Sequence, residues 1–314
     1  MRHELCSATL HTFLTELASR MANIAERGQA AGYISELSRI NLQQFGMSLC
    51  LSDGTCLSVG DANTQFSIQS ISKVFTLAIA LGRFGDHLWT RVGREPSNYA
   101  FNSVSELESQ NGKPRNPFVN AGALVISDAI LKGNTPKTTL AEILTFMRAA
   151  AESNEIYINR TVAHAENKTG HRNYALAHFL RSCGNLDNSC EMVLGTYFHH
   201  CAIEMSCNQL ASAGRFLAGI QSFPRLIGSQ HVRSINALMM IAGHYDGSGD
   251  FAYFVGFPGK SGVGGGILAI VPGVASIAVW SPGLNRYGNS LLGTRALEEL
   301  AHFTRWSLFE SPEN

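Results

Sequence analysis

Ser70 and Lys73 are the pair of residues whose types and spacing indicate chemistry most directly. They stand three positions apart in Ser70-Ile71-Ser72-Lys73, and residues three apart lie on one face of a helix. A serine hydroxyl is a poor nucleophile until a base removes its proton, and a lysine is such a base only as a neutral amine. The pattern therefore predicts acyl transfer through Ser70, provided that burial or nearby positive charge lowers the lysine pKa from about 10.4. Alone, so short a pattern is a weak signal.

A second segment with chemical meaning is Lys260–Gly266, which reads Lys-Ser-Gly-Val-Gly-Gly-Gly. In serine enzymes that recognise penicillins, a Lys-Ser/Thr-Gly strand lies beside the helix that carries Ser-x-x-Lys. The glycines are expected to let a substrate approach the strand edge closely. Alone, the segment is also compatible with a flexible turn. Together the two segments indicate serine acyl transfer on a β-lactamase-like scaffold.

The elements that must position these segments come from both ends of the chain. Apolar spacing predicts an amphipathic helix within Met1–Gly28 and a terminal helix over Thr294–Phe309. Asp53-Gly54 predicts a hairpin between short strands at Met47–Leu51 and Thr55–Ser58. Three more strands are predicted, over Phe251–Phe257, Gly266–Val271 and Ala275–Trp280.

The middle of the chain has a mainly helical pattern. A helix is predicted over Phe66–Leu81, starting within Ser67–Ser70, and further helices from about 120 to 244. The simplest packing is α/β of the α+β type: one antiparallel sheet from both chain ends, flanked by helices, with an inserted all-α lobe. We therefore predict one domain over 1–314, with an α/β lobe of about 1–82 and 246–314 and a mainly helical lobe of about 83–245. A small-molecule site is expected in the cleft between them.

The composition limits the partners. The 24 Lys and Arg residues balance the 24 Asp and Glu residues, so charge gives no reason to expect nucleic acid or an anionic membrane. No run approaches the roughly 20 apolar residues of a membrane span, and residues 1–28 lack a signal-peptide core. The seven cysteines are odd in number and form no Cys-x-x-Cys pair, which favours free thiols over disulfides or zinc. We expect a cytoplasmic protein without cofactor, metal, nucleic-acid partner or membrane partner.

Longer segments resemble the serine-dependent glutaminases of bacteria and mitochondria. The segments are Gly60-Asp61 leading to Phe66–Lys73, then Pro114–Ala123 and Tyr253–Gly266, within a similar region from about Gly32 to Trp280. The resemblance implies a β-lactamase-like fold and hydrolysis of L-glutamine to L-glutamate and ammonia. It also implies a homodimer or homotetramer.

The resemblance assigns roles residue by residue. It makes Ser70 the nucleophile and Lys73 its base, and Tyr245 is our candidate proton donor to the leaving ammonia. Substrate-binding roles are implied for Tyr33, Gln69, Asn120, Glu166, Asn173, Tyr197, Tyr245 and Val263. Chemistry supports these roles, because Glu166 can hold an ammonium while Asn and Tyr donate to a carboxylate. Backbone N–H groups of Ser70 and Val263 would stabilise the oxyanion by about 3–4 kcal/mol each. Without the resemblance, the same residue types would be core aromatics, helix caps or surface charges.

Two residues depart from the family pattern, and two further motifs are set aside. His244 stands where methionine is common, and Gly259 where alanine is common. Both adjoin the site and are expected to affect loop flexibility or affinity. Residues 199–201, His-His-Cys, do not have zinc-ligand spacing. Residues 127–129, Ser-Asp-Ala, lack the asparagine of the Ser-Asp-Asn element of β-lactamases, and we predict a structural role for them.

Two alternative functions remain open on these residues. The first is a β-lactamase, penicillin-binding or esterase activity on the same scaffold, against which the missing Ser-Asp-Asn element counts. The second is a non-catalytic glutamine sensor, against which the intact Ser70 and Lys73 count. Ammonia release compared with nitrocefin and p-nitrophenyl ester turnover separates the enzymes, and loss of turnover in Ser70→Ala excludes the sensor.

Overall fold

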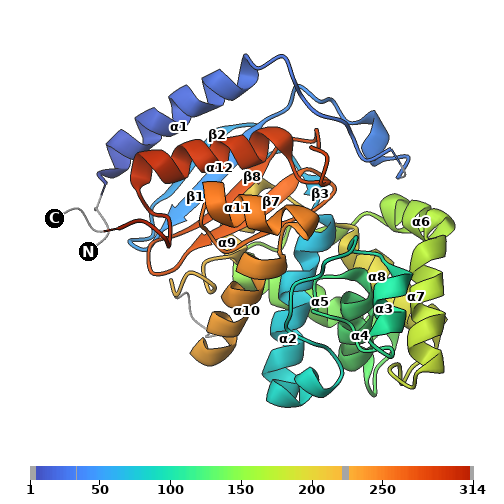
Figure 1. Cartoon of the computed structure of the whole chain (residues 1–314). Coiled ribbons are helices and arrows are strands. Elements are labelled where there is room, and N and C mark those ends of the chain that lie inside the picture. The colour runs from blue at the N-terminus through green and yellow to red at the C-terminus, as the bar shows by residue number, and fades with distance from the viewer. Residues whose placement is uncertain (1–4, 33, 221–225, 312–314) are drawn as a thin grey trace.

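A five-stranded antiparallel sheet forms the centre of the computed structural model, which describes residues 5–32, 34–220 and 226–311 (Figure 1). The strand order is β2-β1-β8-β7-β6. The strands are β1 Gly46–Leu51, β2 Cys56–Gly60, β6 Gly259–Ser261, β7 Gly266–Val271 and β8 Ala275–Trp280. Segments from both chain ends therefore share one sheet, as the sequence predicts.

Both faces of this sheet are covered at β1, β7 and β8, which explains why these three strands are continuous, buried and mainly apolar runs. In β7, Ile267 and Ala269 pack with α1 (Ser7–Ala22) and α12 (Leu291–Thr304). The intervening Leu268 belongs to the core on the opposite face, which the sheet shares with the helical layer. Figure 1 shows α1 and α12 lying side by side across the sheet, with the helical layer on its other side.

The helical layer comes from the middle of the chain. Its elements are α2 Ser72–Phe84, α3 Val104–Ser109, α4 Asn120–Leu131, α5 Pro136–Ala151, α6 Arg160–Thr169, α7 His171–Ser182, α8 Cys190–Cys201, α9 Cys207–Ala213 and α10 Ser229–Ala242. Helix α11, Ser248–Phe254, follows and packs into the core that α1 and α12 share with the sheet. A second sheet has the order β3-β5-β4, made of Phe66–Ser67, Ile203–Met205 and Tyr157–Ile158. Among the described residues, no helix is long and apolar enough to cross a membrane. The two-lobe division with boundaries near 82 and 246 stays a prediction.

The strand predicted over Phe251–Phe257 is wrong, because helix α11 occupies Ser248–Phe254. Phe251 in this helix and Val255, directly after its end, are four apart and both enter the core under the sheet. Tyr253 is 84% exposed, so the aromatic residues do not form one buried strand face. Period 3.6 and period 2 are hard to separate in so short an apolar run.

Helix limits also differ from the sequence prediction. The segment predicted to be helical from Phe66 begins as strand β3, and its α-helix begins at Ser72. The terminal helix predicted over Thr294–Phe309 starts earlier, because the Ser290 side chain accepts from the Gly293 N–H, and it ends at Thr304. Arg305 follows with φ of +56°, a left-handed conformation that terminates helices.

The hairpin at Asp53-Gly54 is confirmed, but its cysteines correct the thiol prediction. Gly54 has φ of +90°, a value that glycine adopts without strain. The register pairs Cys50 directly with Cys56, and their sulfurs form a disulfide. The expectation of free thiols throughout is therefore wrong for this pair. Only strand register, which the cysteine spacing did not reveal, brings the two sulfurs together.

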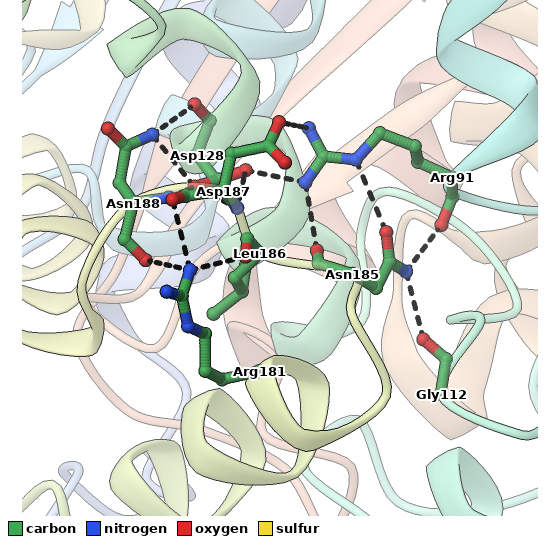
Figure 2. Close-up of polar contacts among 8 residues, drawn as sticks. All are labelled: Arg91, Gly112, Asp128, Arg181, Asn185, Leu186, Asp187 and Asn188. Atoms are coloured by element: carbon green, nitrogen blue, oxygen red, sulfur yellow. Dashed lines mark hydrogen bonds and ion pairs between the residues drawn. The ribbon is translucent and has the colours of Figure 1, made fainter.

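Asp128, in the Ser-Asp-Ala segment on α4, has the structural role predicted for it (Figure 2). Its side chain is fully buried and ion-paired to Arg91. It also accepts hydrogen bonds from the backbone N–H groups of Asp187 (3.1 Å) and Asn188 (2.8 Å). Asn185 donates to and accepts from Arg91 in the same network. The carboxylate thus anchors α4, the helix that begins at Asn120, to the loop before α8.

Replacing Asp128 with alanine is expected to lower the free energy of unfolding by about 3 kcal/mol, because it removes the buried carboxylate that pairs with Arg91 and accepts from the N–H groups of Asp187 and Asn188. Urea unfolding followed by circular dichroism measures this change. The matched control is Asp187→Ala, because the Asp187 carboxylate also pairs with Arg91 but is 63% exposed. That exposed pair should contribute less than about 1 kcal/mol. Equal losses in the two variants would contradict the structural role of Asp128.

Candidate active site

Ser70 and Lys73 both lie at the start of α2. Ser70 lies in a 3-10 turn, Gln69–Ile71, that leads directly into α2, and Lys73 is in the first turn of that helix. Ser70 is 8% exposed and Lys73 is 1% exposed. Gln69 has φ of +50°, a costly conformation for a non-glycine residue and one that clusters at functional sites. The predicted pair is therefore brought together in a buried turn.

The Lys73 amine is held by neutral acceptors. Its Nζ donates to the Phe118 carbonyl (3.0 Å) and to Asn120 Oδ1 (2.7 Å). A neutral amine has two hydrogens and one lone pair, so these two bonds leave the lone pair free. Burial lowers the pKa of Lys73 to about 8, while the nearby Cys201 and Glu166 oppose that shift. A substantial fraction of this lysine is thus neutral at mildly alkaline pH.

The glycine-rich turn after β6 lies directly against the Ser70 segment. A Cβ at Gly262 would lie 2.4 Å from the Ile68 carbonyl oxygen, and one at Gly264 would lie 2.1 Å from the Ser67 carbonyl oxygen. These contacts correct the expected role of the two glycines, which was close approach of a substrate. They allow the turn that carries Val263 to approach the backbone just before Ser70.

A pocket with a volume of about 170 Å³ opens beside Ser70. Seven of the residues predicted to form the site line it: Gln69, Ser70, Asn120, Glu166, Asn173, Tyr197 and Val263. They come from chain segments nearly 200 positions apart, which explains why one local motif could not define the site. Tyr33, also predicted to bind substrate, lies outside the described residues.

Two residues that line this pocket have backbone N–H groups without partners among the described residues. Ser70 and Val263 both line it, and their N–H groups make no hydrogen bond to other described residues. Unpaired N–H groups around a reactive position are the donors that stabilise an oxyanion. The pair predicted from the sequence therefore has the required freedom.

The opposite wall of the pocket is polar and contains one buried carboxyl group. Glu166, on α6, is 9% exposed, and its Oε1 atom has no hydrogen-bond partner among the described residues. Burial raises the pKa of Glu166 to about 7, opposed by Gln69 and by the charge of Lys73. Asn120 Nδ2 donates to Asn173 Oδ1 at 2.9 Å, which orients both amides at the pocket. This wall offers an acceptor for a cation next to amide groups.

Tyr245 adjoins the pocket from the β6 side. Its ring packs on Phe101, which lines the pocket, with centroids 4.6 Å apart. Burial raises the pKa of Tyr245, and hydrogen bonds with Ser70 and Ser261 partly oppose the shift. Lys260 Nζ lies 4.5 Å from the centre of the Tyr245 ring. A protonated phenol thus stands beside Ser70.

Six residues that line the pocket were not among the predicted site residues: Ile34, Phe101, Asn102, Thr169, Gly170 and Arg172. Phe101 and Asn102 lie in the loop between the 3-10 helix Gly85–Thr90 and α3, and this loop carries no motif. Arg172 directly precedes Asn173, so its place in the matching segment was an available signal. No local pattern distinguished Phe101 and Asn102 from ordinary loop residues.

His200 supports α2 rather than belonging to a ligand cluster. Its Nδ1 lies 2.8 Å from Ser72 Oγ and its Nε2 lies 3.2 Å from Ser127 Oγ. Burial lowers the pKa of His200 to about 3, so the imidazole is neutral. Within the described ranges, no group of three or more His, Cys, Asp or Glu residues is placed to hold a metal ion.

The chain is similar to known proteins along most of its length. A family model described as Glutaminase matches residues 28–309. The chain is 56% identical over 300 residues to a protein named glutaminase from Mesorhizobium japonicum, covering 94% of this chain and 95% of that protein. It is 55% identical over 313 residues to one from Rhizobium meliloti, covering 98% and 99%.

A solved structure is similar over the same extent. It is a probable glutaminase from Bacillus subtilis complexed with 6-diazo-5-oxo-L-norleucine. The TM-score is 0.86 at 32% sequence identity, and the match covers 98% of this chain and all of the other.

Proposed function

Because the chain belongs to the glutaminase family, with its β-lactamase-like fold, we propose how its own residues divide the hydrolysis of L-glutamine. The enzyme converts L-glutamine to L-glutamate and ammonia. The observation that carries the proposed division is that Ser70, two free backbone N–H groups and a buried carboxyl line one pocket directly beside Lys73.

The acylation step begins with Ser70. Neutral Lys73 accepts the hydroxyl proton while Ser70 Oγ forms a bond to the amide carbon of the substrate. The carbonyl oxygen becomes an oxyanion, which the N–H groups of Ser70 and Val263 stabilise by about 3–4 kcal/mol each. The carbon–nitrogen bond then breaks, and Tyr245 donates a proton to the leaving ammonia. Lys73 passes the proton that it took from Ser70 to Tyr245, which restores the phenol.

Water completes the reaction. It attacks the ester on Ser70 while Lys73 accepts one of its protons, and the carbon–Oγ bond breaks as that proton returns to Ser70. L-Glutamate leaves, and each group regains its initial protonation state. The pocket volume of about 170 Å³ is compatible with one amino acid of this size.

The substrate head group is assigned to the polar wall. Glu166 binds the ammonium, and Asn120, Asn173 and Tyr197 are placed around the same pocket to bind the carboxylate. Gln69 lines the pocket next to Ser70. Tyr33 is assigned to substrate binding on the family resemblance alone.

Steady-state ammonia release from L-glutamine tests this function. Nitrocefin and p-nitrophenyl esters are the comparison substrates, because a β-lactamase or esterase on this scaffold would turn them over. We expect turnover of glutamine but not of nitrocefin or p-nitrophenyl esters. Incubation with 6-diazo-5-oxo-L-norleucine should leave a covalent adduct on Ser70. Rapid nitrocefin hydrolysis without ammonia release would replace this proposal by the β-lactamase alternative.

The kcat/KM for glutamine is expected to rise from about pH 6 to pH 9, because two groups must lose protons. Glu166, with its pKa raised to about 7, binds the ammonium as an anion, and Lys73, with its pKa lowered to about 8, acts as a base when neutral. Replacing Glu166 with glutamine should remove the first step and raise KM by about 10- to 100-fold, as expected for a lost charged hydrogen bond. The second step should shift to lower pH, because the Glu166 charge raises the pKa of Lys73.

The pH dependence of kcat/KM for the wild type and Glu166→Gln measures both effects. Glu108→Gln is the matched control, because Glu108 is exposed and lies outside the pocket. A Glu166→Gln profile that keeps both steps would show that another group titrates near pH 7 and would remove Glu166 from the ammonium site.

For the assembly and compartment we propose a homodimer or homotetramer in the cytoplasm. The family membership supports the assembly, and sedimentation equilibrium measures it. The five free cysteines found among the described residues suit a reducing compartment, whereas the Cys50–Cys56 disulfide counts against one.

A further inference from the structure

His244 is a buried polar side chain that the proposed mechanism does not use. It is 1% exposed, and neither ring nitrogen has a hydrogen-bond partner among the described residues. A buried donor without a partner destabilises a fold unless its shape contributes something else. The imidazole is stacked face to face on Phe251, with centroids 3.5 Å apart and an interplanar angle of 13°. Shape, rather than hydrogen bonding, is therefore what this ring supplies.

Gly259 is the residue that makes room for the ring. A Cβ at this position would lie 2.6 Å from His244 Nε2 and 2.8 Å from Phe251 Cε1. Real Cβ atoms essentially never come so close to other atoms, so any side chain here must displace the stacked rings. The stack of His244 on Phe251 and the missing side chain at Gly259 depend on each other.

The backbone on both sides of this contact leads to the active site. Tyr245 follows His244 directly and has φ of +54°, a conformation that the surrounding structure must enforce in a tyrosine. Ser248 Oγ accepts from the His244 N–H at 3.0 Å and donates to the Tyr245 carbonyl at 2.8 Å. Asn289 Nδ2 donates to the His244 carbonyl at 3.0 Å. A shift of the His244 ring therefore moves the segment that holds Tyr245.

The β6 side is bonded to the same segment. Lys260 Nζ donates to the carbonyls of Gly243 (3.0 Å) and Ser261 (2.7 Å), and the Ser261 N–H donates to the Gly243 carbonyl (3.0 Å). The same Nζ atom lies over the Tyr245 ring. Strand β6 and residues 243–245 are thus joined by hydrogen bonds. The contact between Gly259 and His244 determines the distance between these two segments.

We propose that His244 and Gly259 form a coupled packing pair that positions Tyr245 beside Ser70. His244 is thus a positioning residue: it acts through shape on its neighbour and exchanges no proton with the substrate. This inference rests on the proposed role of Tyr245 as proton donor. The residues assigned to the substrate head group lie on α4, α6, α7 and α8, and neither His244 nor Gly259 lines the pocket, so the pair should affect kcat rather than KM.

The test is a double-mutant cycle of Gly259→Ala and His244→Met, assayed by ammonia release from L-glutamine. Gly259→Ala is expected to lower kcat by about 10²-fold with little change in KM, as for a catalytic group displaced by about 1 Å. His244→Met should cost only a few-fold, because an unbranched, flexible side chain fills irregular space. The double variant should recover most of the loss, to the level of His244→Met alone. Gly249→Ala is the matched control, because a Cβ there meets no atom within 4 Å.

Two further readouts decide the outcome. His244→Met should keep the shape of the wild-type pH profile, and loss of a titration step would show that His244 handles protons and overturn the proposal. A Gly259→Ala loss that persists unchanged in the double variant would also overturn it. If Gly259→Ala does not fold, folding of the double variant supports the pair, and failure of both refutes it.

Failure of the pair is distinguishable from failure of the proposed function. Tyr245→Phe should lower kcat at least as much as Gly259→Ala does. If Tyr245→Phe is inactive while Gly259→Ala is fully active, the packing pair is wrong and the role of Tyr245 stands. If Tyr245→Phe is fully active, the proton-donor assignment itself is wrong.

Discussion

Replacing Ser70 with alanine is expected to lower kcat for glutamine by about 10⁴- to 10⁶-fold, because no other group can carry the acyl intermediate. The pocket walls are unchanged, so the variant should still bind glutamine. Ammonia release measures the first effect and titration calorimetry the second. In the wild type, hydroxylamine should intercept the ester on Ser70 and give γ-glutamyl hydroxamate, and Ser70→Ala should give none.

Ser72→Ala is the matched control for this prediction. Ser72 is also buried in the same turn, but its Oγ donates to the Gln69 carbonyl at 2.7 Å and contacts His200. Its loss should reduce stability while leaving acyl transfer in place. An inactive Ser72→Ala beside an active Ser70→Ala would transfer the nucleophile to position 72 and refute the mechanism proposed above.

Replacing Lys73 with methionine is expected to lower kcat by about 10³- to 10⁴-fold, the upper range for removal of a general base. Methionine keeps much of the apolar volume, so the loss should come from chemistry rather than from a cavity. The double variant Ser70→Ala/Lys73→Met should be no worse than Ser70→Ala, because the base has no function without the nucleophile. Additive losses in that cycle would contradict their joint action.

Lys73→Arg separates the charge of this residue from its basicity. A guanidinium stays protonated at every pH of interest, so it supplies charge but cannot accept the Ser70 proton. We expect Lys73→Arg to remain inactive up to pH 9, whereas the activity of the wild type rises through the Lys73 pKa of about 8. Substantial activity of Lys73→Arg would mean that this residue acts through charge alone.

The site could be predicted from the sequence where contiguous segments carried it. Ser70 and Lys73 lie in adjoining turns at the start of α2, and residues 166–173 run from α6 into α7. Each matching segment therefore identified several site residues at once. Phe101 and Asn102 could not be found in this way, because their loop has no pattern and reaches the pocket through tertiary packing.

The glycines of residues 262–266 illustrate a second limit. The sequence predicted that these glycines leave room for a substrate, whereas two of them leave room for the chain itself. A Cβ at Gly262 or Gly264 would meet the chain just before Ser70. A glycine can indicate that another group lies too close for a side chain. Which group that is depends on strands and turns that are distant in the sequence.

Neighbouring residues were enough to predict the Ser-x-x-Lys pair, the hairpin at Asp53-Gly54 and the apolar strands of the sheet. Other properties depend on distant residues and became visible only in the folded chain. These are the helix at Ser248–Phe254, the disulfide of Cys50 with Cys56 and the burial that lowers the pKa of Lys73. The physical reason is that side-chain type and spacing act along the chain, whereas desolvation, strand register and close contact arise only where separated segments meet.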